Sequence, residues 1–320
     1  MFFFEPFSLS TGVIVVVFLI ALILLNEIAR LNKWLGVAMF IVLPVILTIF
    51  VWPKTAVAGT GAGSWFQWAK VYSSLAGCIG FMAIRYIPKL QKNKIALSFP
   101  AFILAINIAE AVARDFQLPG LVANAIANGQ LIGVFANIDG YATNAGPWNY
   151  INGIAGILNI VTICGWFGII IGQDKKKDML WPDMMWFWIL AYDFWNLAYV
   201  YNSVSDRAMY SGVVLLLACT IPAFFIKKGA WLQHRAQTLA FMMMFTLTVP
   251  WFFTSAQFAV KSTHSPAAHY IFSIIALLSN IAVAGYQAYV IVKNKKNPLK
   301  DELYTDLNYY KAIVAESKKA

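Results

Sequence analysis

Two acidic side chains lie inside long apolar stretches of this sequence, where a charge is costly. Glu110 lies in INIAEAVARD and Asp193 in ILAYDFWNLAYVYN. At the centre of a membrane-spanning helix an ionisable group costs about 2.5–3.5 kcal/mol, so such a residue is usually functional. Carboxylate oxygens are hard ligands that suit H⁺, Na⁺, Ca²⁺ or Mg²⁺. We therefore expect Glu110 and Asp193 to bind a cation, as ligands if it is a metal ion.

Polar residues surround Asp193 along one side of its predicted helix. This stripe comprises Tyr192, Asp193, Asn196, Tyr199, Asn202 and Ser203. No cation lies in the same helix, so Asp193 is protonated, paired with another helix, or bound to a cation. We expect Asn196 and Tyr199 to line the same site. The alternative is a hydrogen-bonded cluster that serves packing alone.

Glu110 shares a helix face with Asn107 and Arg114, because the three residues are spaced at i, i+3 and i+7. One interpretation is an intrahelical Glu110–Arg114 pair that neutralises itself. The functional interpretation is a carboxylate that lines an aqueous cavity, with Asn107 beside it and Arg114 as its counter-charge.

Asparagines mark three further candidate positions. Asn152 and Asn159 recur with Gly156 on one face of WNYINGIAGILNIVT, and Asn280 lies in the last apolar stretch. Amides and small residues on one face either pack membrane helices closely or line a site for an ion or polar solute. Asp139 lies in a loop rich in Gly and Asn, which forms either an outer vestibule, filter or lid, or a plain loop.

The elements that must position these residues are membrane-spanning helices. Of 320 residues, 60% are hydrophobic and only 12% are charged, which excludes an ordinary soluble domain or a nucleic-acid-binding module despite the net charge of +10. Continuous apolar runs predict helices rather than a β-barrel. The chain is thus predicted to be an all-α integral membrane protein. We expect nine spans, at 11–29, 34–52, 66–87, 97–113, 148–172, 181–202, 208–226, 233–258 and 267–292.

The positions of Lys and Arg predict the orientation. With the N-terminus outside, five of the 24 basic residues (Lys54, Lys70, Arg114, Arg207 and Lys261) fall outside, and the remaining 19, Arg235 among them, fall inside. This asymmetry follows the positive-inside rule and predicts contact with anionic lipids of the inner leaflet. A tenth span over 121–136 would reverse it, so we interpret that stretch as re-entrant or interfacial.

Residues 1–292 thus form a predicted transmembrane domain with an outer region at 114–147, and 293–320 form a polar cytoplasmic tail with its C-terminus inside. A short helix over 301–316, which could lie on the inner leaflet, is predicted within the tail. The expected location is the cytoplasmic (inner) membrane of a bacterium, and an oligomer is compatible with these features.

Motifs for enzymatic chemistry are missing from the sequence. It has no phosphate-binding glycine loop, no His/Cys cluster for zinc or haem, and no nucleophile elbow. We therefore expect neither an enzyme nor a cofactor beyond a bound cation.

Two stretches, YDFWNLAYVYN at 192–202 and WLQHRAQTLAFMMM at 231–244, resemble an uncharacterised bacterial family of multipass membrane proteins that carries only a domain-of-unknown-function label. That resemblance implies no activity. NIAE at 107–110 is similar to the Asn–Glu motif of cation/calcium exchangers, but NIAV at 280–283 has Val283 where a second carboxylate would stand. The helices that carry Asn and Trp also resemble, in composition, small-solute facilitators of the vitamin and sugar type.

Three functions remain open from the sequence. The first is cation transport by a channel or by an ion- or proton-coupled carrier. The second is a facilitator for a small neutral or zwitterionic solute, held by amides and stacked on aromatic rings. The third is a membrane scaffold or sensor without transport, whose polar network only specifies packing.

Overall fold

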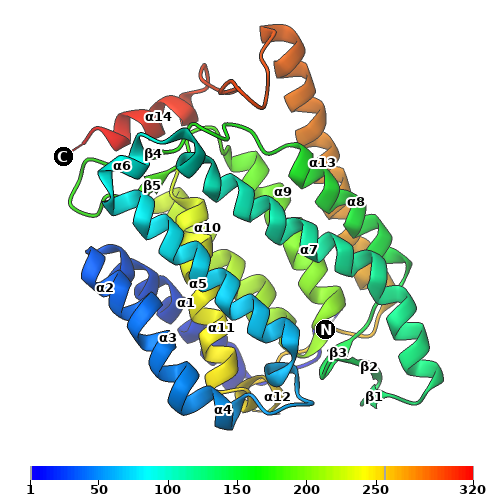
Figure 1. Cartoon of the computed structure of the whole chain (residues 1–320). Coiled ribbons are helices and arrows are strands. Elements are labelled where there is room, and N and C mark those ends of the chain that lie inside the picture. The colour runs from blue at the N-terminus through cyan, green and yellow to red at the C-terminus, as the bar shows by residue number, and fades with distance from the viewer. Residues whose placement is uncertain (1, 256, 320) are drawn as a thin grey trace.

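Long helices dominate the computed structural model, which describes residues 2–255 and 257–319 (Figure 1). Residue 256, in the predicted span 233–258, lies outside the described residues, as do residues 1 and 320 at the outer limits of the two predicted domains. Each of the nine predicted spans falls on a helical segment. Three short strands at 131–143 and a two-stranded pair complete the secondary structure.

The first third of the chain is helical almost throughout. It comprises α1 (Leu9–Arg30), α2 (Lys33–Val37), α3 (Leu43–Ile46), α4 (Trp52–Thr55), α5 (Trp65–Tyr86) and α6 (Pro88–Gln91). Two π-helical turns, η1 (Ala38–Val42) and η2 (Leu47–Val51), flank α3, which contains Pro44. Proline removes a backbone donor, and wider turns accommodate that loss, so 33–55 stays one continuous helical segment.

Helix α7 (Lys94–Ala127) and the hairpin after it replace the predicted re-entrant segment. α7 has 34 residues, so it is about 51 Å long at 1.5 Å per residue, well beyond a hydrocarbon core of about 30 Å. Residues 121–127 simply extend α7. The chain then forms β1 (Leu131–Ile132), β2 (Phe135–Ile138) and β3 (Tyr141–Thr143), an antiparallel sheet in that order. Its Asp139–Gly140 turn has φ of 54° and 82°, as a type I′ hairpin requires.

The rest of the chain alternates long helices with short connections. In order these are α8 (Pro147–Val161), β4 (Ile170–Ile171), β5 (Met179–Leu180), α9 (Trp186–Ser203), the 3₁₀ turn η4 (Ser205–Arg207), the π-helical η5 (Ala208–Val214), α10 (Leu215–Phe225), α11 (Trp231–Thr248), α12 (Trp251–Thr254), α13 (Pro266–Asn294) and α14 (Asn308–Ser317). Strands β4 and β5 pair antiparallel.

Two predicted spans are shorter as helices than expected. The span predicted over 148–172 ends as a helix at Val161, because Gly165 adopts φ of 62° against the Asp183 side chain and turns the chain. The span predicted over 233–258 ends at Thr248, since Pro250 follows. In both places the apolar run continues beyond the end of the helix. Hydropathy alone therefore does not show where the helix stops.

Among the described residues, five helical segments are long and apolar enough to cross a membrane, namely Leu9–Arg30, Lys33–Thr55, Lys94–Ala127, Ser205–Phe225 and Pro266–Asn294. Their outward faces carry large exposed apolar side chains, such as Val16 and Ile20 on α1 and Ile49 and Phe50 on η2. Apolar faces of this extent are typical of a protein embedded in lipid. Helices α5, α8, α9 and α11 are less apolar or shorter.

The connections between helices gather at two ends. We call one the hairpin end; there Tyr141 bonds Gln67, Thr143 bonds the carbonyl of Ser203, and Ser262 bonds that of Ser205. At the opposite tail end, the loop at 172–178 contacts α1, α5 and α14. Figure 1 shows β1–β3 at the lower right and β4, β5 and α14 at the upper left. The loops predicted inside all meet at the tail end.

The polar tail packs against the rest of the protein. Both carboxylate oxygens of Asp183 accept backbone N–H groups, from Tyr304 at 2.8 Å and Leu303 at 2.9 Å. Ile313 of α14 is fully buried against Leu180 and Ala230. The tail helix therefore exists but begins at Asn308, later than predicted.

Buried apolar residues form two main clusters. One joins α1, the segment 33–55, α5, η5–α10 and α11; the other joins α7, α8, α9 and α13. Helix α1 also contacts residues that are distant in the sequence, since Asn26 is hydrogen-bonded to His234 at 2.7 Å. The space between the two clusters holds the site described next.

Candidate functional site

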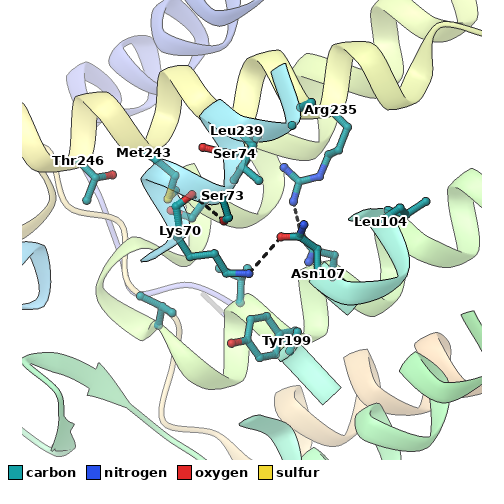
Figure 2. Close-up of a pocket in the computed structure, with 18 of the residues that line it drawn as sticks. Lys70, Ser73, Ser74, Leu104, Asn107, Tyr199, Arg235, Leu239, Met243 and Thr246 are labelled. Carbon is teal, nitrogen blue, oxygen red and sulfur yellow. Dashed lines mark hydrogen bonds between the residues drawn. The ribbon is translucent and has the colours of Figure 1, made fainter. Parts of the chain in front are cut away.

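A cavity of about 140 Å³ lies where the two clusters meet. Helices α5, α7, α9 and α11 and the η5–α10 segment line it. Its volume is close to the ~150 Å³ of an engineered cavity that admits benzene. Figure 2 shows Lys70 directed toward Asn107, with Arg235 and Tyr199 on opposite sides of them. The cavity thus has room for a small organic molecule or several waters.

Basic residues supply all the formal charge on the described wall of the cavity. Lys70, Arg207 and Arg235 line it, whereas no Asp or Glu among residues 2–255 and 257–319 does. A cleft lined by one sign of charge and by low-dielectric walls concentrates ions of the opposite sign. The electrostatics of this cavity therefore favour an anion.

Arg235 is the most exceptional of the three basic residues. It is the fifth residue of α11, and its guanidinium is buried. It donates only long hydrogen bonds, to Asn196 Oδ1 at 3.3 Å and Tyr192 Oη at 3.4 Å, and its Nη1 has no partner within the described chain. No carboxylate of the described residues forms a salt bridge with it. A buried charge in this state is costly unless a ligand completes it.

Lys70 and Arg207, by contrast, each have an acidic partner behind the wall. Lys70 Nζ lies 2.8 Å from Glu110 Oε2 and 3.4 Å from Asn107 Oδ1. Arg207 is held by Asp206 through contacts of 3.1 and 3.2 Å, yet its Nη1 has no partner in the described part of the protein. These pairs fix both side chains in place and leave Arg235 as the basic residue of the described wall that has no ion pair, since Asp193 acts on it only through longer-range electrostatics.

Aromatic and aliphatic side chains make up most of the remaining wall. Trp195 and Tyr199 of α9 stack with an interplanar angle of 21°, and Tyr192 packs against Trp195. Leu239 and Met243 of α11 face them across the cavity. An apolar wall with few polar groups is the usual composition of a site for a small organic ligand.

Three of the nine residues predicted from sequence line this cavity, namely Asn107, Asn196 and Tyr199. Glu110 touches it only through Lys70 and is itself about one-third exposed. The expected Glu110–Arg114 pair is wrong: Arg114 instead bonds Asp139 at 2.7 Å. Glu110 and Asp139 thus each pair with a basic residue that is distant in the sequence. Helical spacing does not indicate such a partner.

Asp193 lies apart from the cavity wall. Its Oδ2 accepts a hydrogen bond of 2.7 Å from Thr220, whose hydroxyl oxygen in turn accepts one from Trp231 Nε1. Its Oδ1 has no partner among the described residues. The predicted alignment of Asp193 with Asn196 and Tyr199 is therefore wrong, because Asp193 points toward α10.

The remaining predicted residues also lie away from the cavity. Asn152 donates to Asp115, a buried acid that sequence reasoning missed because it follows the predicted end of its span. Asn159 is buried with no side-chain partner in the described chain, and Asn280 donates to the carbonyls of Ala191 and Ala276. Asp139 forms the hairpin turn.

Nor do the acids converge on a metal site. Within residues 2–255 and 257–319, no three His, Cys, Asp or Glu side chains are arranged to hold a metal ion. Glu110 and Asp193, the predicted metal ligands, lie on different helices with separate partners.

A second buried charge group, the tail-end cluster, lies among α1, α5 and α11. Asp178 accepts from Arg30 at 2.9 and 3.1 Å and from Gln233 at 2.7 Å, and lies 3.8 Å from Arg85. Burial alone would raise the pKa of Asp178, but hydrogen bonds from Arg30 and the charges of Arg30 and Arg85 hold it well below its ordinary value. Arg30 also pairs with Glu27, which lies one turn earlier in α1.

A model of one protein family matches residues 5–316, nearly the whole chain. The chain belongs to DUF5692, a family of unknown function. This confirms the resemblance to an uncharacterised family. No curated protein and no solved structure shows a significant similarity to it.

In the sequence, the basic residues that dominate the cavity contribute only to the count of Lys and Arg that predicts the orientation. Lys70 and Arg235 fall inside the predicted spans 66–87 and 233–258, a few residues from their starts. That position was the available signal, since a basic side chain within a span requires an explanation. Arg207 and Tyr141 carried no such signal, because tertiary packing brings the hairpin to η4.

Proposed function

We propose that this protein binds a small organic anion in its central cavity and carries it across the membrane. The observation that carries the proposal is Arg235, a buried guanidinium that lines the cavity with one nitrogen unpartnered and no ion pair within the described residues. The proposal is closest to the second sequence hypothesis, with an anionic group on the solute in place of neutrality.

The chemistry of the wall narrows the ligand class. A guanidinium presents a planar set of N–H donors that matches a carboxylate in a bidentate contact. The aromatic wall and the volume near 140 Å³ suit a compact apolar or aromatic body. A monocarboxylate the size of benzoate combines these features.

The membrane setting in this proposal is nine crossings in a bacterial cytoplasmic membrane, with the N-terminus outside. Two observations support it: the predicted inner loops meet at the tail end, and the predicted outer loops meet at the hairpin end. Cysteines placed singly in the two sets of loops, labelled in intact cells with an impermeant reagent, test the orientation. Labelling of the tail-end set would reverse it.

Cation transport remains the second candidate, on one observation. Oδ1 of Asp193 is buried without a partner in the described residues, as a site for a proton or a small cation requires. Against it stand the basic wall of the cavity and the separation of Asp193 from Glu110. A scaffold or sensor without a ligand is the third hypothesis.

Thermal stabilisation of the purified protein separates these candidates. Benzoate, neutral benzamide and cationic benzylamine have nearly the same shape, and Na⁺, Ca²⁺ and Mg²⁺ serve as the cation panel. At 100 times its Kd a ligand stabilises by about 2.7 kcal/mol, a shift of several degrees in Tm. We expect benzoate alone to produce it. Stabilisation by benzylamine or by a metal ion would contradict the proposal, and stabilisation by none would favour a scaffold.

The Arg235→Gln variant ties the effect to the cavity. It should abolish the shift with benzoate, because it removes the unmatched charge. The matched control is Arg114→Gln, which also removes one positive charge but lies outside the cavity, in a pair with Asp139. Loss of benzoate binding in both variants would indicate a general charge effect and contradict the assignment.

Transport is tested separately in proteoliposomes. Vesicles loaded with unlabelled benzoate should accumulate labelled benzoate by exchange, and Arg235→Gln vesicles should not. Stabilisation without exchange would reduce the function to binding, as in a sensor.

A further inference from the structure

The entrance to the central cavity is the feature that the structure allows us to assign next. We propose that an anion enters from a cleft at the hairpin end, past Arg207, and that the Tyr141–Gln67 hydrogen bond closes this entrance. The proposal rests on the proposed function, since it concerns how the same ligand reaches its site.

An open cleft of about 410 Å³ lies at the hairpin end. Three stretches line it: the loop at 57–62, the hairpin around Asn137 and Gly140, and residues 250–254. Its described lining contains a single charged residue, Arg207. The cleft is therefore a mildly basic vestibule.

Arg207 belongs to the lining of both the cleft and the central cavity. Its Nη1 has no partner in the described chain, although the residue is buried. Asp206, which holds the other side of the guanidinium, lines neither space. An anion that passes from cleft to cavity thus meets the guanidinium and not its counter-ion.

Tyr141 forms the partition beside Arg207. Its ring lies 4.7 Å from the Arg207 guanidinium carbon, and its hydroxyl donates to Gln67 Oε1 at 2.8 Å. Tyr141 and Gln67 line the cavity, whereas Gly140, the preceding residue, lines the cleft. The wall between the two spaces is therefore one residue thick at this point.

Two backbones lie in close contact at the partition. A Cβ on Gly140 would lie 2.3 Å from the backbone nitrogen of Gly61, so not even one added carbon fits between the hairpin and the loop at 57–62. Rupture of the single Tyr141–Gln67 hydrogen bond is the smallest change that would open the passage.

The rate at which a thiol inside the cavity is modified measures access directly. Ser74 lines the cavity and bonds only its own helix, so Ser74→Cys is a mild change. The native Cys78, Cys164 and Cys219 are buried and line neither space, so the unmodified protein serves as background. An anionic and a cationic methanethiosulfonate are compared, each normalised to its rate with free cysteine.

In Ser74→Cys the anionic reagent should react about 10-fold faster than the cationic one, in the range of electrostatic steering. The double change Asp206→Asn with Arg207→Gln should lower this ratio several-fold, and Lys70 and Arg235, which still line the cavity, account for the preference that remains. It removes both charges together, so no buried carboxylate is left unpaired. An unchanged ratio in this variant would overturn the assignment of the entrance.

Tyr141→Phe keeps the ring and removes the hydrogen bond to Gln67. It should accelerate both reagents several-fold without changing their ratio. Equal rates with and without the hydroxyl would overturn the role of Tyr141 in closure.

Benzoate stabilisation of the unmodified protein keeps this test distinct from that of the proposed function. A cooperative thermal unfolding transition in each entrance variant shows separately that the variant is folded. If benzoate stabilises the unmodified protein and the reagent rates do not change in the variants, the entrance fails and the proposed function stands. If benzoate stabilises no form of the protein while the rates change as expected, the proposed function fails.

Discussion

Two buried groups of basic residues differ in how completely their charge is matched. At the tail end, Arg30 and Arg85 surround Asp178. The two carboxylate oxygens of Asp178 accept hydrogen bonds from Arg30 and Gln233. In the central cavity, Arg235 has two long hydrogen bonds to neutral oxygens and no carboxylate partner in the described residues. Both groups are buried among helices, so burial does not distinguish them.

The comparison separates structural charge from charge that is available to a ligand. A buried ion pair with all its hydrogen bonds made fixes the elements around it, here α1, α5, α11 and the loop at 172–178. A buried charge without a partner holds its helices together poorly, but it is preorganised for an anion. Perturbing the two groups should therefore have opposite consequences.

The largest effect is expected at the tail end. Asp178→Asn leaves Arg30 and Arg85 without their shared counter-charge, which should destabilise the protein by about 3–5 kcal/mol. The fall in thermal unfolding temperature measures it. Asp174→Asn is the control, since Asp174 is partly exposed in its pair with Lys227 and should cost less than about 1 kcal/mol. Similar small losses in both variants would show that Asp178 does not hold the tail end together and would remove the contrast with the central cavity.

The central cavity should respond in the opposite direction. Arg235→Met removes an unmatched buried charge, so the empty protein should gain about 1–2 kcal/mol while benzoate stabilisation disappears. Thermal unfolding with and without benzoate measures both. A loss of stability as large as that of Asp178→Asn would place Arg235 among the structural residues.

A smaller effect is expected where the tail is attached. Lys227 bridges Asp174 at 2.9 Å and Glu316 at 3.3 Å, and these partners raise its pKa against the opposing effect of burial. Lys227→Met should cost about 1 kcal/mol and should expose α14 to protease before the rest of the chain. Limited proteolysis checks the order of cleavage, with Lys228→Met, a neighbour outside these pairs, as the control. Equal cleavage of the tail in both variants would show that Lys227 does not attach the tail to the rest of the protein.

The smallest effect is expected from mild acid. Because the folded-state pKa of Asp178 is lowered, its contribution is complete above the unfolded value of about 3.9 and is lost as pH falls toward the folded value. The difference in stability between the wild type and Asp178→Asn should therefore stay constant from pH 8 to about pH 5. A difference that shrinks across this window would mean that the Arg30–Asp178 contact does not hold in solution.

The sequence predicted the helices well because apolar runs report directly on burial in lipid. It predicted their ends less well: the run TICGWFGIII stays apolar beyond Val161, although the chain turns at Gly165. The Asp139–Gly140 pair was a readable hairpin signal that the search for membrane spans obscured.

The site was predicted only in part, for a physical reason. Helical spacing shows which residues share a face, so Asn196 and Tyr199 were correctly grouped. Helical spacing cannot show which distant segment of the chain supplies a partner. Such partners determine the roles of Glu110, Arg114 and Asp193. An acid inside a span is rare and therefore a clear signal, whereas a basic residue near the end of a span, such as Lys70 or Arg235, is also expected from the positive-inside rule.

The contact between α1 and α11 has a consequence for biosynthesis. Asn26 meets His234, a residue 208 positions later in the chain. At about 5–20 residues per second, a ribosome needs roughly 10–40 s to synthesise that interval. During that time the face of α1 that includes Asn26 lacks its partner on α11. Helix α1 is also the most hydropathic of the candidate spans among the described residues, so its affinity for an apolar environment offsets the cost of one unpaired amide.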